Sequence, residues 1–328
     1  MTDPVLKVTD LEVGARGVPL VRKVSFQLAR GERLGLVGES GSGKSLTSLA
    51  VMRLNTPPTA ITGGSVLLGD RDLVRADERE MERVRGARVA MVYQDPMSSL
   101  NPVRTIGAQV AEAIRAHEDV PAKAAHARAV DLLGEVGVPD PAARARDYPH
   151  QFSGGMRQRV VIAMAIAASP EVLIADEPTT ALDVTTQARI LELLDRLIGE
   201  LGMSVLFITH DLAVAAGFCD RLNVMYAGRV VESGPVADVF AAPEHPYTRA
   251  LIDSNCTFAL DPDQDIPAIG GQPPVAGALP AGCAFHPRCP LAEDACRVDD
   301  PLPLVPGPGR LIECHVAARR YEKGVAAL

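Results

Sequence analysis

One stretch of eight residues constrains this chain more than any other: Gly38-Glu39-Ser40-Gly41-Ser42-Gly43-Lys44-Ser45. It fits the pattern G-x-x-x-x-G-K-[S/T], a loop whose backbone N–H groups, with the start of the following helix, cradle phosphates. The apolar run Arg33–Val37 before it predicts a strand, and Lys44–Leu54 after it has apolar residues at helical spacing. The residues expected to hold phosphate are Gly38, Ser40, Gly41, Ser42, Gly43, Lys44 and Ser45. Lys44 is expected to neutralise the β and γ oxygens and Ser45 to ligate Mg²⁺.

A second element is the apolar run Val172-Leu173-Ile174-Ala175, which ends in the carboxylates Asp176 and Glu177. The run predicts a strand, and open α/β sheets bind ligands at the carboxyl ends of their strands. Asp176 is expected to hold Mg²⁺ through water. Glu177 is expected to act as the general base that polarises the attacking water.

Between these elements lies Phe152-Ser153-Gly154-Gly155-Met156, roughly 20 residues before the carboxylates. Ser153, Gly154 and Gly155 can open a helix and form a second anion site with their N–H groups. Three further polar residues stand out: Gln94 after Val89–Tyr93, Asp183 in Ala181-Leu182-Asp183, and His210 after Val205–Thr209.

This ordered set resembles the ATP-binding cassette (ABC) class, with Ser153-Gly154-Gly155 in the place of its signature sequence. The resemblance implies that Gln94 contacts Mg²⁺ or water, that His210 contacts the γ-phosphate, and that Asp183 belongs to the D-loop. It also implies head-to-tail dimers, in which the signature serine of one chain faces the ATP of the other. The enzyme is then an ATPase that works mostly by positioning and charge stabilisation.

The fold expected from the resemblance is α/β: a P-loop NTPase (RecA-like) core with an antiparallel β subdomain and a helical subdomain at about 97–168. Strands and helices alternate from Glu171 to Val231, as a parallel sheet with crossover helices requires. The alternation of strand and helix patterns ends after about residue 235, and residues 262–308 are rich in proline and glycine. We therefore expect an ATPase domain over 1–240 and an irregular, cysteine-rich extension over 241–328. The family's adenine-stacking aromatic is absent from residues 1–25, so Arg16 or aliphatic side chains would replace it.

Two segments narrow the family. Tyr93-Gln94-Asp95-Pro96-Met97-Ser98-Ser99-Leu100-Asn101-Pro102 and His245-Pro246-Tyr247-Thr248-Arg249-Ala250-Leu251 resemble the D-type ATPases of oligopeptide and dipeptide permeases. The resemblance implies a second homologous ATPase in a heterodimer, two transmembrane permease subunits and an extracytoplasmic substrate-binding protein. Nickel and glutathione importers share much of the pattern, so the solute stays open.

The tail carries Cys283, Cys289, Cys296 and Cys314, spaced x5, x6 and x17. Four thiolates in a segment with little hydrophobic core form a plausible metal site, because the free energy of metal binding can stabilise such a segment. A [4Fe–4S] cluster is the expectation, as in the similar tails of peptide-importer ATPases. Zinc and disulfides or free thiols remain alternatives, although zinc sites usually show closer C-x₂₋₄-C pairs. We expect packing or solvent roles for His286 and His315, and apolar packing for Cys219.

Composition excludes several other classes of protein. The net charge is −8 without a run of Lys or Arg, which disfavours nucleic-acid binding. The longest apolar run, Val160–Ala168, is nine residues, and the N-terminus shows no secretory signal. The cytoplasm is therefore the default compartment, and the resemblance to permease ATPases implies the cytoplasmic face of the membrane, where permease subunits hold the chain. A DNA-maintenance ABC ATPase would need a long insertion, but only 58 residues separate Gln94 from Ser153. An ABC translation factor would need two cassettes, and the chain has one.

Overall fold

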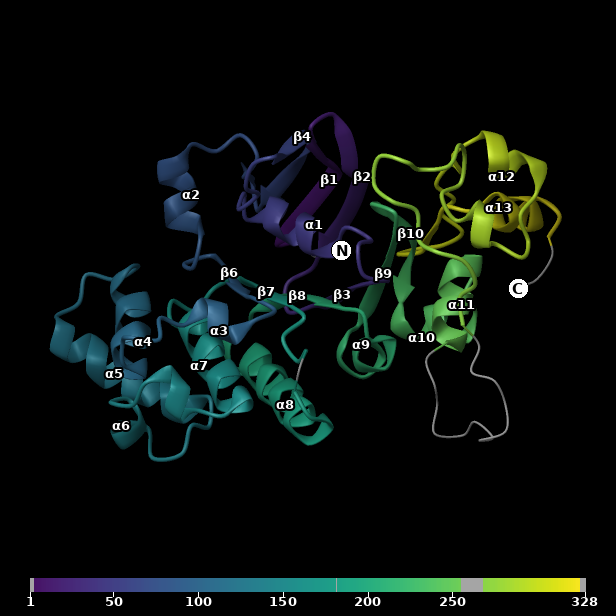
Figure 1. Cartoon of the computed structure of the whole chain (residues 1–328). Helices are drawn as coiled ribbons and strands as arrows, with labels where there is room; N and C mark the ends of the chain where they lie inside the picture. Colours follow the sequence, from purple (N-terminus) through teal and green to yellow (C-terminus); the bar gives the residue numbers. More distant parts are fainter. Residues whose placement is uncertain (1–2, 181, 255–267, 325–328) are drawn as a thin grey trace. The chain divides into compact units, whose positions relative to one another are not determined.

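The computed structural model of the chain describes residues 3–180, 182–254 and 268–324. Two compact units divide it, and each is built from segments that are distant in sequence (Figure 1). The first comprises residues up to Leu6, Leu28–Glu32 and Arg75–Ile208; the second comprises Lys7–Gln27, Arg33–Val74 and residues from Thr209 onward. The boundary expected near residue 240 divides the ATPase domain from the C-terminal extension along the sequence. It is a different division from these two units, and it stays a prediction.

The first unit contains three parallel strands in the order β8-β7-β6. They are β6 (Val89–Val92), β7 (Val172–Asp176) and β8 (Ser204–Thr209), and every residue in them is buried. Strands covered on both faces read as continuous apolar runs, which is why the sequence predicted them. Because the three strands are parallel, their carboxyl ends lie at one edge of the sheet. Gln94 follows β6 and Glu177 follows the neighbouring strand β7, so both residues lie at this edge.

Helices make up most of the rest of this unit, and α4 to α7 lie together in Figure 1. The helical pattern expected over 97–168 is present. Helix α4 is amphipathic and buries Ile106, Val110 and Ile114. The helices are α2 (Glu78–Val84), α3 (Pro96–Ser99), α4 (Ile106–Arg115), α5 (Ala122–Glu135), α6 (Pro141–Arg144), η1 (Pro149–Gln151), α7 (Gly154–Ile166) and α8 (Val184–Leu201).

The second unit contains a four-stranded sheet in the order β2-β1-β4-β5. Its strands are β1 (Leu6–Ala15), β2 (Val18–Leu28), β4 (Thr59–Leu68) and β5 (Arg71–Asp72). The loop between strands β1 and β2 is only Arg16 and Gly17. Both residues have positive φ, at 51° and 81°, as a two-residue hairpin turn requires.

A second set of strands in this unit has the order β11-β10-β9-β3. Strand β3 (Arg33–Val37) runs parallel to β9 (Arg221–Tyr226), which pairs antiparallel with β10 (Arg229–Pro235). The helices of the unit are α1 (Lys44–Val51), α9 (Leu212–Phe218), α10 (Val236–Ala241), α11 (Pro246–Asp253), η2 (His286–Arg288), α12 (Asp294–Val298) and α13 (His315–Glu322). Within the described residues, no helix is both long and apolar enough to cross a bilayer.

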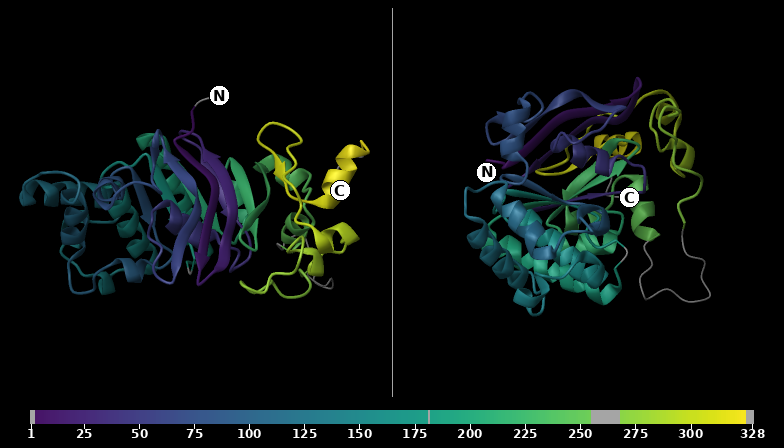
Figure 2. Two further views of the ribbon diagram at one scale, coloured as in Figure 1. Left: turned by 90° about the horizontal axis from the view of Figure 1, so that it is seen from above. Right: turned by 60° about the vertical axis from the view of Figure 1, so that its left-hand side comes forward.

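The C-terminal tail is more ordered than the sequence predicted. Its short strand β11 (Leu311–Ile312) extends the sheet by pairing with β10, and both views in Figure 2 show the tail against this unit's strands. Several ion pairs join it to the rest of the same unit, among them Arg310–Glu232 at 3.1 Å, Arg320–Glu244 at 3.2 Å and Arg229–Asp300 at 3.0 Å. The expected lack of a local core is therefore compensated by contacts with residues of the cassette.

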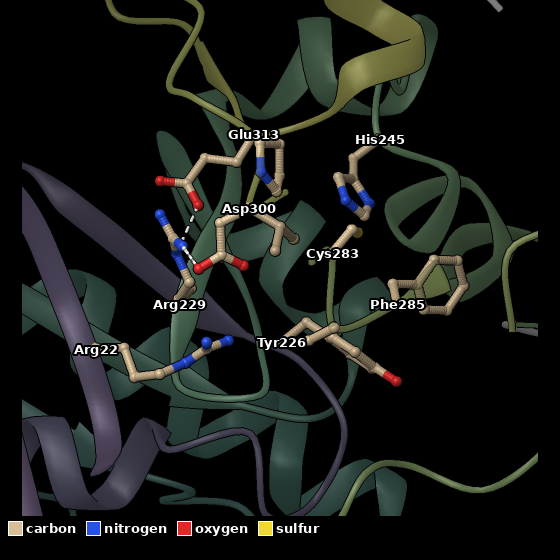
Figure 3. A pocket seen from close by; sticks show the side chains of 11 residues that line it. Arg22, Tyr226, Arg229, His245, Cys283, Phe285, Asp300 and Glu313 are labelled. Atoms are coloured by element: carbon tan, nitrogen blue, oxygen red, sulfur yellow. Dashed lines mark ion pairs between the residues drawn. The ribbon is translucent and has the colours of Figure 1, made fainter. Parts of the chain in front are cut away.

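A small cavity of about 20 Å³ lies where this tail meets the strands (Figure 3). Arg229 is held there by Asp300 and Glu313, and His245 and Cys283 also line the space. His245 is 1% exposed, and its backbone N–H donates to Glu232 at 2.9 Å. The Nδ1 atom of His245 accepts the Tyr247 N–H at 3.0 Å and so caps α11.

Burial without a charged partner lowers the pKa of His245 to about 3. The unfolded chain takes up a proton near pH 6.5 and the folded chain does not, so stability is lost as the pH falls from 6.5 toward 3. In that range His245 adds about 1.4 kcal/mol per pH unit to the slope of the unfolding free energy against pH. We expect His245→Asn, which keeps a capping acceptor, to flatten the pH dependence of the unfolding free energy by about that amount.

Urea denaturation between pH 6.5 and pH 4 measures this slope. His150→Asn, at an exposed histidine, is the matched control and should keep the slope of the unmodified chain. Equal slopes for His245→Asn and the unmodified protein would contradict a buried, neutral His245.

Candidate functional site

The loop Gly38–Ser45 connects β3 to α1, in the strand–loop–helix context that its sequence predicted. Gly38, Gly41 and Gly43 have positive φ of 150°, 79° and 104°. A Cβ on Gly38 would lie 2.2 Å from the Met225 carbonyl oxygen, so no other residue fits there. The loop is also fixed at its far end, because Gly228 N–H donates to the Ser42 carbonyl at 2.9 Å.

Polar groups of this loop are buried around Lys44. Its Nζ donates to the carbonyls of Gly38 at 2.7 Å and Glu39 at 3.0 Å, and the residue is 5% exposed. The Ser42 hydroxyl is buried without a hydrogen-bond partner among the described residues. Ser40, Gly41 and Ser45 are exposed. A loop with an ammonium group at its centre and accessible N–H groups around it suits an anion of phosphate geometry.

The two carboxylates lie at the end of β7, as predicted. Asp176 is the last residue of the strand and is buried, at 6% exposed. Glu177 has a positive φ of 47°, and its N–H donates to the Ile208 carbonyl at 2.9 Å. A non-glycine residue in this conformation is held there by its surroundings, and such positions concentrate at functional sites.

Gln94 follows β6 and reaches Glu177. The Gln94 Nε2 atom donates to Glu177 Oε2 at 2.8 Å, and the Thr180 hydroxyl donates to the same oxygen at 2.9 Å. Since its amide nitrogen makes this bond, the Gln94 carbonyl oxygen is the atom suited to a cation. Thr180 was not predicted as a site residue; its place three residues after Glu177 was the available signal.

Ser153 caps helix α7, because its hydroxyl accepts the Met156 N–H at 3.4 Å. Ser153 and Gly154 are exposed, whereas Phe152 is buried and anchors the segment. A helix of 13 residues thus begins at the surface with a serine and two glycines. This arrangement leaves the N-terminus of α7 accessible to an anion from outside the chain.

Asp183 begins helix α8 close to this serine segment. It accepts the Thr186 N–H at 2.9 Å and the Thr186 hydroxyl at 2.7 Å, and these bonds lower the pKa of Asp183. A Cβ on Gly155 would lie 2.4 Å from Thr186 Cγ2. Gly155 and Asp183 are therefore joined through Thr186. Ala181 of the same motif lies outside the described residues.

His210 follows β8 directly and is exposed, as its sequence position predicted. The next residue, Asp211, caps helix α9 by accepting the Val214 N–H at 3.1 Å. Arg16, expected among the residues that replace the family's adenine-stacking aromatic, lies in the β1–β2 turn.

The metal site expected at the four tail cysteines finds no support in the structure. In the described parts of the chain, no three His, Cys, Asp or Glu side chains are gathered so that they could hold a metal ion. Cys314 lies against Ile312 and Ala317, and Cys283 lines the small cavity. Burial raises the pKa of Cys283 to about 11 and of Cys314 to about 12, which disfavours the thiolate.

The other expectations for this region have mixed outcomes. Each described cysteine is a free thiol, so the disulfide alternative finds no support there. One ring nitrogen of His286 and one of His315 lie within hydrogen-bond distance of backbone carbonyls, at 3.0 Å and 2.8 Å. Cys219 is buried and its pKa is raised to about 12 by burial, as apolar packing predicts. Cys256 lies outside the described residues.

Comparison with known proteins decides the family. Residues 21–180 match the model of the ABC transporter family, and residues 231–296 match that of the oligopeptide/dipeptide transporter C-terminal region. The chain is 48% identical to the dipeptide transport ATP-binding protein DppD of Escherichia coli, over 90% of each chain. The chain belongs to the ABC transporter ATP-binding proteins. ABC ATPases of this kind hydrolyse ATP to power transport.

Two further likenesses agree with this ABC assignment. The oligopeptide transport ATP-binding protein OppD of Bacillus subtilis is 49% identical, over 88% of this chain and 82% of its own. Among solved structures, the ATP-binding cassette MJ0796, described as a dimer in a post-hydrolysis state with ADP and Pi, has a TM-score of 0.63 at 28% identity. It covers 70% of this chain and 98% of its own. The ABC cassette fold expected from the motifs is confirmed.

The contact between Gly155 and Thr186 gives a stability prediction. Gly155→Ala should lower the unfolding free energy by about 1–3 kcal/mol, because the new methyl group overlaps Thr186 Cγ2. Thr186→Ser removes that methyl but keeps the hydroxyl that bonds Asp183. The double variant should therefore regain most of the loss in urea denaturation. If the double variant instead lost as much unfolding free energy as the two single variants together, the contact would be contradicted.

Proposed function

We propose that this chain is the ATP-hydrolysing subunit of an importer of dipeptides or oligopeptides, bound at the cytoplasmic face of the membrane. The observation that carries the catalytic part is the hydrogen-bonded group Gln94–Glu177–Thr180 at the ends of β6 and β7. A glutamate held by an amide and a hydroxyl is oriented to take a proton from water.

In this proposal the loop binds the triphosphate and the carboxylates act on it. Gly38, Ser40, Gly41, Ser42 and Gly43 supply the cradle. Lys44 leaves the carbonyls of Gly38 and Glu39 for the β and γ oxygens. Glu177 accepts the proton of the attacking water, and His210 contacts the γ-phosphate.

The residues proposed for Mg²⁺ fit the ion chemically. Ser45 offers a hydroxyl, Gln94 an amide oxygen and Asp176 a carboxylate that acts through water, and hard cations prefer such oxygen ligands. When bound, the ion supplies charge neutralisation at the β and γ oxygens. The protein's own contribution is to hold these donors and to orient Glu177.

A second chain completes each site in this proposal. The exposed start of α7, with Ser153, Gly154 and Gly155, would bind the γ-phosphate of the ATP held by a partner ATPase. Asp183, linked to it through Thr186, would lie at the same interface. The dimeric solved structure of MJ0796 supports this mode of association. We expect the partner to be a homologous but different ATPase.

The solute and the remaining partners follow from the relatives. DppD and OppD are named for dipeptide and oligopeptide transport, and the matching C-terminal region carries the same description. We therefore propose peptides as solute, two permease subunits as membrane anchors and an extracytoplasmic substrate-binding protein. Nickel and glutathione import remain the alternatives within the family. Nothing in the sequence or structure favours DNA maintenance.

The central test of this function is Glu177→Gln in the assembled transporter. Loss of the general base should lower the ATP turnover number about 10²–10⁴-fold while leaving ATP binding intact. Glu192→Gln, at an exposed carboxylate of α8, is the control and should keep full turnover. A Glu177→Gln transporter that hydrolyses ATP at the unmodified rate would refute the assigned role.

We propose separately that Cys283, Cys289, Cys296 and Cys314 bind a [4Fe–4S] cluster, which would require the four sulfurs to draw together. What supports it is the resemblance of the tail and the mutual influence of the thiols: Cys289 and Cys296 add to the raised pKa of Cys283. Protein purified without oxygen should contain about four iron and four sulfide per chain, measured by elemental and sulfide analysis. Zinc without iron, or neither metal, would end this proposal.

A further inference from the structure

Glu39, the second residue of the phosphate-binding loop, is held by two residues from the C-terminal part of the chain. Its carboxylate accepts two hydrogen bonds from Arg288: Nη1 donates to Oε2 at 2.8 Å, and Nη2 donates to Oε1 at 3.0 Å. Its backbone N–H donates to the Tyr247 hydroxyl at 2.8 Å. Its carbonyl accepts the bond from Lys44 Nζ. Every polar group of Glu39 is thus engaged, one of them by the phosphate-binding lysine.

The Arg288 side chain is built into this position. It is 3% exposed, against 25% for the Glu39 side chain. Its other N–H groups donate to the carbonyls of Gly270 at 2.8 Å and Ile269 at 3.3 Å, and to the Tyr226 hydroxyl at 3.3 Å. A two-point bond between a guanidinium and a carboxylate fixes both partners in orientation as well as in distance.

The supporting residues form an aromatic cluster of Tyr226, Tyr247 and Phe285. Their ring centroids lie 4.6 Å apart for Tyr226–Tyr247, 5.2 Å for Tyr226–Phe285 and 5.4 Å for Tyr247–Phe285. The Arg288 guanidinium lies 5.8 Å from the Tyr226 ring and 5.9 Å from the Phe285 ring. Tyr247 and Phe285 are almost fully buried. The cluster therefore holds Arg288 and the Tyr247 hydroxyl rigidly.

Both Tyr247 and Arg288 belong to the region that matches the transporter C-terminal family model. Tyr247 lies in the segment His245–Leu251, which the sequence marked as distinctive and to which the hydrolysis mechanism assigns no role. We propose that Arg288 and Tyr247 are positioning residues for the phosphate-binding loop, so that the C-terminal region sets the nucleotide affinity of the cassette. This inference rests on the proposed binding of nucleotide by Lys44.

Arg288 and Tyr247 would affect nucleotide binding in two ways, through the charge of Glu39 and through the backbone conformation of the loop. Arg288 neutralises a carboxylate that directly follows Gly38 in a loop built for anions. Without Arg288, the Glu39 charge is unpaired and repels the triphosphate, and removing one partner of a buried pair is strongly unfavourable. The Tyr247 hydroxyl fixes the backbone at the same residue.

The test is MgADP binding to the full chain by isothermal titration calorimetry. Arg288→Ala should weaken binding about tenfold. Arg288→Ala combined with Glu39→Gln should return to within threefold of the unmodified chain, because the repelling charge is gone. Tyr247→Phe keeps the ring and removes only the hydroxyl, and should weaken binding about threefold even if Arg288→Ala does not fold.

Arg310→Ala is the matched control. Arg310 joins the same tail to the cassette through Glu232 at 3.1 Å but does not touch the loop, so this variant should bind MgADP within twofold of the unmodified chain. An Arg288→Ala chain that binds within twofold of the unmodified one, a double variant no tighter than Arg288→Ala, or an unchanged Tyr247→Phe would overturn the inference. Lys44→Ala separates the two proposals, because undiminished binding in that variant would instead refute the nucleotide site.

Discussion

The close approach of the phosphate-binding loop to strand β9 is the constraint on which the rest of the nucleotide chemistry depends. Gly38 passes the Met225 carbonyl with no room for a side chain, and Gly228 holds the loop through Ser42. Because β9 is paired with both β3 and β10, the loop is held by a sheet and not by its own turns. This backing keeps the loop backbone in place before any nucleotide arrives, so in our proposal only the Lys44 side chain has to change partners on binding.

The C-terminal region extends that backing from strands to side chains. Strand β11 pairs with β10, and Arg288 and Tyr247 reach Glu39 from the same region. The tail has little core of its own, so its stability comes from contacts with the cassette strands. The same contacts connect it to the loop that carries the phosphate-binding lysine. We infer that an extension that seems appended in sequence is part of the frame of the proposed nucleotide site.

Local patterns predicted the parts of this site that are built from local structure. The glycine loop, the buried strand ending in Asp176, and the serine cap of α7 each depend on residues within a few positions of one another. Contacts between distant residues were not predictable in this way. Glu39 and Arg288 are 249 positions apart, and β11 is a two-residue strand that exists only because β10 offers an edge. The cysteine spacing suggested a metal site, but among the described residues no three candidate ligand side chains are gathered to hold a metal ion.

The central claim is that Lys44 and Glu177 act on one MgATP whose γ-phosphate is also contacted by the signature serine of a partner ATPase. The most direct measurement is an experimental structure of the assembled transporter with Mg²⁺ and a non-hydrolysable ATP analogue. The account predicts the γ-phosphate in contact with Lys44 and His210, Mg²⁺ bound by Ser45, and Ser153 of this chain at the nucleotide of the partner ATPase. A nucleotide whose phosphates lie away from Lys44, or a Ser153 that faces no nucleotide, would contradict it.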